Sequence, residues 1–109
     1  MNGRLFVVCL LALGAALAAG AWWLRDSASA VTVDEIGDKI QTVRRGRLPV
    51  FASDGDVATL YRFAADRPDA LAGVVCTCGC VNFGHASNRA CYIKAERGDE
   101  QTFTSHAAT

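Results

Sequence analysis

The sequence predicts a small, helix-rich α+β domain that contains a cysteine cluster and follows an N-terminal membrane-spanning or signal segment. Three observations favour this architecture. An uncharged apolar run fills residues 5–24, two amphipathic helical patterns follow it, and two alternating segments come near the end. A chain of 109 residues has room for one domain at most. We therefore divide it into an anchor or signal segment with a linker, residues 1–30, and an exported domain, residues 31–109.

The apolar run has the length and the flanks of a membrane span. Its twenty residues, at about 1.5 Å each, cross a hydrocarbon core of about 30 Å. Arg4 precedes the run and places the N-terminus in the cytoplasm, while Trp22 and Trp23 suit the far interface. The segment ending at Ala30 also has the A-x-A pattern of a cleavage site. An uncleaved anchor and a signal peptide cleaved after Ala30 are the two readings, and both send the domain out of the cytoplasm.

A first helix is expected after a linker at residues 27–31. Thr32 and Glu35 have the spacing of a capping box at a helix start. Apolar residues then recur at i, i+4 and i+7, on one helical face: Ile36, Ile40 and Val43. Gly46 ends this pattern, and residues 48–51 are expected to be extended.

A second helix and a hairpin complete the predicted domain. The helix begins at the cap in residues 53–56 and runs to about Asp66, and Pro68 either ends it or opens a short turn through Leu71. One face of this helix is apolar: Val57, Leu60, Tyr61 and Ala64, with Phe63 beside it. Residues 91–95 and 102–104 alternate around a polar turn, which predicts a weak hairpin.

The charge of the exported part is close to balanced. Residues 27–109 carry nine Lys or Arg against ten Asp or Glu, a net charge of −1. No basic stripe is present, so the sequence argues against nucleic acid as a partner. A domain of this size buries only a modest core and is typically stabilised by disulfides or a metal ion.

The strongest chemical signal is a run of three cysteines at alternate positions, Cys76, Cys78 and Cys80, followed by His85 and Cys91. In an extended segment these three side chains project to one face. Thiolate and imidazole are ligands of Cu(I) and Zn(II). The sequence therefore predicts a soft-metal site built from the four cysteines, with His85 as an auxiliary ligand in an exposed loop. His106 is a weaker candidate.

Two disulfides in an oxidising compartment are the alternative for the four exported cysteines. A bond within C-x-C is unfavourable, because alternate residues of a strand lie about 6.6–7 Å apart at Cα. Cys91 can pair with only one of the other three. At least two of the clustered thiols would therefore remain without a favourable disulfide partner. This favours a metal-binding or redox role of the cysteines over purely structural crosslinks.

The cysteine region resembles a known bacterial family. The resemblance rests on residues 61–71, 74–80, 83–88 and 91–94, where the thiols, the Gly-His pair and the lead-in to the cysteine run fall in register. These segments are similar to the PCYCGC-motif proteins, which are small extracytoplasmic proteins, often lipoproteins, of poorly defined function. The resemblance covers roughly residues 57–109, with Val75 in place of the motif's proline and Thr77 in place of its tyrosine. The family pattern continues past a histidine like His106 into a further C-x-x-C pair, so either this member lacks that pair or the sequence is a fragment.

These observations lead to one preferred function and two alternatives. We expect an extracytoplasmic protein that binds a soft metal, Cu(I) as first choice and zinc in a structural site as second, and that exchanges it with an unknown metal-delivery protein. The alternatives are a thiol-disulfide redox protein and a disulfide-stapled interaction module. The sequence contains no recognisable nucleophile, base and orienting-group set and no catalytic carboxylate pair, so we do not expect an enzyme.

Overall fold

The computed structural model describes residues 2–25, 28–77 and 79–109, and for Arg25, Cys80 and Phe83 it describes the backbone alone. The elements are, in chain order, α1 (Gly3–Arg25), β1 (Thr32–Val33), β2 (Lys39–Arg44), η1 (Val50–Ala52), α2 (Gly55–Asp66), α3 (Pro68–Ala72), η2 (Cys80–Phe83), η3 (Asn88–Cys91), β3 (Ile93–Arg97), β4 (Glu100–Thr104) and η4 (His106–Ala108). The strands form one antiparallel sheet in the order β1-β2-β4-β3. The α+β prediction is confirmed.

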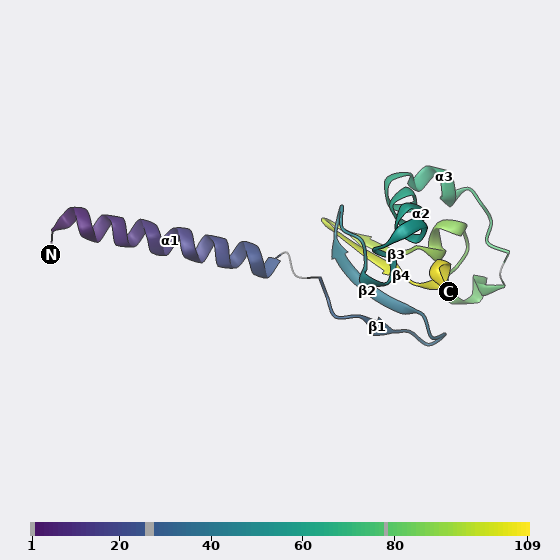
Figure 1. Cartoon of the computed structure of the whole chain (residues 1–109). Coiled ribbons are helices and arrows are strands. Elements are labelled where there is room, and N and C mark those ends of the chain that lie inside the picture. The colour runs from purple at the N-terminus through teal and green to yellow at the C-terminus, as the bar shows by residue number, and fades with distance from the viewer. Residues whose placement is uncertain (1, 26–27, 78) are drawn as a thin grey trace.

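Helix α1 stands apart from the rest of the molecule (Figure 1). Its segment Gly3–Leu24 has a mean hydropathy of 2.3 and no part of it is buried. The helix is therefore long and apolar enough to cross a membrane, and it is compatible with either an anchor or a signal segment.

The prediction of a first helix between Thr32 and Gly46 is wrong, because this region forms strands β1 and β2 with a tight turn between them. Asp34 Oδ1 accepts hydrogen bonds from the backbone N–H of Ile36 at 3.1 Å and of Asp38 at 3.0 Å, and these bonds hold the turn. Gly37 takes a φ of +91° within it. The predicted linker at residues 27–31 also contacts β2, since Ser29 N donates to Thr42 O at 3.0 Å.

The sequence pattern indicated a helix instead of strand β2 because Gln41 is polar and yet faces the core. Gln41 is buried because its Nε2 donates to Ser29 O at 2.9 Å and its Oε1 accepts from Val50 N at 2.8 Å. With Val43 it gives β2 an inward face of period two. The expected extended segment 48–51 is also corrected, since its second half enters the 3-10 turn η1.

Helix α2 and the hairpin of β3 and β4 confirm the later expectations, and α3 begins at Pro68. Tyr61 is fully buried at the centre of the core, where its ring meets Tyr92 edge-on at a centroid distance of 4.9 Å. Leu60 was expected on the buried face of α2 but is half exposed. The buried core cluster consists of Val43, Ala52, Tyr61, Ile93 and Phe103.

The segments that carry the candidate ligands gather at one end of the domain. Turns η2 and η3 and the C-terminus lie at the end remote from α1, beyond the hairpin and the sheet (Figure 1). The fold therefore places α1 and the candidate site on opposite sides of the sheet.

Candidate metal centre

Backbone contacts bring the start of the cysteine run beside η3. Asn88 N donates to Val74 O at 2.8 Å, and Val75 forms a β-bridge with Ser87. The next residue, Cys76, is partly buried, and its Sγ lies 3.6 Å from Sγ of the buried Cys91. This distance is a contact between two sulfur atoms and is longer than the S–S bond of a disulfide, about 2.05 Å.

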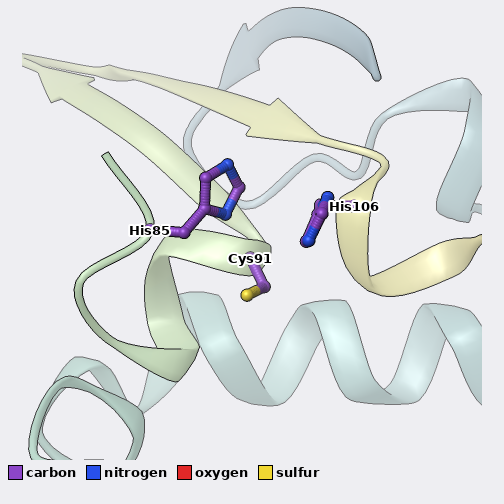
Figure 2. A group of neighbouring side chains, drawn as sticks. All are labelled: His85, Cys91 and His106. Carbon is purple, nitrogen blue, oxygen red and sulfur yellow. The ribbon is translucent and has the colours of Figure 1, made fainter. Parts of the chain in front are cut away.

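Three donor side chains converge beside this sulfur pair. His85, Cys91 and His106 each offer a ligand atom, and these atoms all lie within 4.8 Å of one another. Figure 2 shows them approaching from three segments: His85 from the loop before η3, Cys91 from η3 and His106 from the turn after β4. The two imidazole rings are tilted at 48° with centroids 4.5 Å apart. The group combines two nitrogen donors and one sulfur donor in a small volume.

A carboxylate fixes the orientation of His106. Its Nδ1 lies 2.8 Å from Oδ2 of Asp38, a residue that is 6% exposed. Because a carboxylate accepts, Nδ1 donates to Asp38, and in the neutral ring Nε2 then carries the lone pair. Histidines that bind metals typically donate their other ring N–H to a carboxylate in this way. Asp38 thus prepares His106 to act as a ligand through Nε2.

His85 is buried, with only 1% of its surface exposed, which corrects the expectation of an exposed loop histidine. Within the described part of the chain its Nδ1 has no hydrogen-bond partner. Burial lowers the pKa of His85, and the neighbouring His106 lowers it further. Both effects favour the neutral form of the ring, which is the form that binds metals. Gly84 turns the chain into this position with a φ of +87°.

The family of the chain follows from its sequence profile. The family described as "Protein of unknown function with PCYCGC motif" matches residues 8–109. The chain belongs to this family. The match extends well beyond residues 57–109, where the sequence resemblance was expected. Comparison with curated proteins and with solved structures finds no match.

The structure brings together some, but not all, of the ligands predicted for this PCYCGC-motif protein. Cys76 and His85 each lie close to Cys91, whereas Cys78 lies outside the described residues, as does the side chain of Cys80. The straight strand expected for the run does not continue to Cys80. Gly79 adopts a φ of +82°, and Cys80 begins the 3-10 turn η2.

The structure places His106, a weaker candidate in the sequence, within the donor group, and places beside it Asp38, which the sequence analysis did not single out. Asp38 follows the turn between β1 and β2, 68 positions before the histidine that it contacts, and no local pattern connects the two residues. Together with Cys91 they form a thiol, imidazole and carboxylate series, which the sequence analysis did not find. Cys91 is 7% exposed, so a bulky substrate would have little access to this thiol.

Proposed function

We propose that this protein binds one soft or borderline metal ion outside the cytoplasm through His85, Cys91 and His106, with Cys76 as a further ligand. The observation that carries the proposal is the convergence of three donor atoms within 4.8 Å. Around one ion with bonds of about 2.0–2.3 Å, tetrahedral donors lie roughly 3.3–3.8 Å apart. Movements of about 1 Å would bring the three donors to these distances.

Two further features support a ligand at this place. The buried His85 has a ring nitrogen with no hydrogen-bond partner among the described residues, and burial of an unpartnered polar atom is costly. An ion would provide that partner. His106 has the carboxylate contact that is typical of metal-binding histidines. An apolar packing role explains neither feature.

The number of ligands separates the two candidate metals. Cu(I) accepts few ligands and favours thiolate, so His85, Cys91 and His106 would suffice for it. Zn(II) in a structural site takes four, and Cys76 would complete a Cys2His2 set, with its sulfur 3.6 Å from that of Cys91. Cu(I) remains our first choice and zinc the second. Cys78 and Cys80 stay as candidate ligands on the grounds of sequence alone.

The same proposal includes the location of the domain. We place it on the outer side of the membrane, either anchored by residues 5–24 or released after Ala30. A metal-delivery protein as the source or the recipient of the ion is part of this proposal.

The test is an anaerobic titration of the reduced full chain in detergent with Zn(II), and with Cu(I) against a chromophoric competitor. We expect one ion per chain and a loss of at least tenfold in affinity in Cys91→Ser. Cys9→Ser in α1 is the matched control and should bind like the natural chain, because Cys9 is exposed on the apolar helix. X-ray absorption should detect nitrogen as well as sulfur ligands. A sulfur-only shell, or equal affinity in Cys91→Ser, would reject the proposed ligand set.

A further inference from the structure

We infer that Cys76 and Cys91 form a reversible disulfide, and that this bond and metal binding exclude each other. The second half of the inference rests on the proposed function, while the first half stands on the geometry of the two cysteines alone. The pair would connect the metal site to the thiol-disulfide state of the surrounding compartment.

The fold holds the two sulfur atoms at a distance that suits both states. At 3.6 Å, their separation is close to the roughly 3.8 Å of two thiolates on one tetrahedral ion. Closing to a bond of about 2.05 Å requires each sulfur to move by less than about 1 Å. The β-bridge between Val75 and Ser87 keeps the two segments side by side in either case.

The exposure of the two cysteines gives the order of the reaction. Cys76 is partly exposed, whereas Cys91 is buried. A small-molecule disulfide, RSSR, therefore reacts first with the thiolate of Cys76, which forms a mixed disulfide and releases one RS⁻. The thiolate of Cys91 then attacks Sγ of Cys76, which forms the internal disulfide and releases the second RS⁻. Two protein thiols are oxidised, one external disulfide is reduced to two thiols, and a bound ion leaves in its own oxidation state.

Oxidation would remove both sulfur donors of the described site together. Sulfur in a disulfide has lost the thiolate charge that binds Cu(I) or Zn(II). Only His85 and His106 would remain, and two neutral imidazoles are a poor site for either ion. The inference thus explains why a partly exposed cysteine is packed against a buried one at the edge of the ligand group.

The experiment uses the full chain in detergent with Cys9, Cys78 and Cys80 replaced by serine, so that Cys76 and Cys91 are the only thiols. Oxidised glutathione is added, and alkylation with mass spectrometry is expected to give a Cys76–Cys91 crosslink, reversible by a phosphine reductant. Zn(II) affinity should fall at least 100-fold on oxidation and return on reduction. The matched variant with Cys76→Ser in the same background is expected to bind Zn(II) more weakly from the start, but its own affinity should change by less than threefold on the same oxidation.

Each outcome bears on a different part of the inference. Failure of the two cysteines to crosslink would overturn the disulfide, and an oxidised protein that binds Zn(II) as tightly as the reduced one would overturn the exclusion. If the crosslink forms but the reduced chain binds neither Zn(II) nor Cu(I), the proposed function fails while the disulfide pair stands.

Discussion

Replacing Asp38 by Asn tests whether the Asp38 carboxylate orients His106 for metal binding. Asp38 is 6% exposed, and its Oδ2 lies 2.8 Å from Nδ1 of His106. The amide has the same shape but no charge, and its NH2 group can face the ring and favour the wrong tautomer. The backbone N–H of residue 38 still donates to Asp34 Oδ1, so the turn is retained. The substitution thus changes the support of the His106 imidazole and removes a charge that also acts on His85, while the turn is kept.

The expected magnitude follows from this geometry. Loss of the partner that orients a metal-binding histidine typically lowers affinity by about 10–100-fold, which corresponds to roughly 1.4–2.7 kcal/mol. Because this contact is short and largely shielded from solvent on the Asp38 side, we expect the upper half of that range for Asp38→Asn. The assay is competition titration of the reduced full chain with Zn(II) or Cu(I), with thermal unfolding of the metal-free protein alongside.

Glu35→Gln is the matched control, because it removes one negative charge from an exposed position in the same turn. It should leave the affinity within threefold of the natural chain. If Asp38→Asn and Glu35→Gln bind metal equally well, the Asp38 carboxylate does not orient His106 as a metal ligand.

Four further predictions address the fold, the loop, the pH dependence and the membrane segment. Tyr61→Phe should cost about 1–3 kcal/mol, because the buried hydroxyl donates to Thr104 O at 2.7 Å; the midpoint of thermal unfolding measures this, and an unchanged midpoint contradicts it. Gly84→Ala should destabilise by about 1–2 kcal/mol through its positive φ, whereas Gly73→Ala, at a φ of −81°, should not, and equal denaturant midpoints would count against the strained turn. Because folding lowers the pKa of His85, the unfolded chain binds the proton of this residue first as the pH falls. The stability of the metal-free protein should therefore decrease below pH 6.5, by up to about 1.4 kcal/mol per pH unit for this group, and His85→Gln should remove that slope. The full chain should stay in membranes through a carbonate wash, and a released product that begins at Val31 would show cleavage after Ala30 instead.

Local patterns predicted the elements that local interactions specify. Helix α2, the turn at Pro68 and the hairpin of β3 and β4 have caps, breakers or alternation within a few residues, and the structure contains all of them. The region of β1 and β2 did not follow its pattern. Its helical spacing was coincidental, because a buried Gln41 satisfied by Ser29 and Val50 looks in sequence like a solvent-facing residue.

The sequence predicted the types of donor atom in the candidate site but only some of its residues. Cysteines and a histidine near one another indicated metal ligands, and the structure brings Cys76, His85 and Cys91 together. The approach of His106 and Asp38 depends on the antiparallel pairing of β2 with β4, which places Ile40 opposite Thr104. That pairing joins segments about sixty residues apart, so no short window of sequence contains it.

The candidate ligand group is spread widely along the chain, from Asp38 to His106, and its parts meet only when the sheet and the turns after it have formed. If the domain crosses the membrane as an unfolded chain with residue 31 leading, His106 would follow Asp38 and the cysteines. The proposed site would then be incomplete before export, and the proposed ion would be acquired in the compartment where the domain folds.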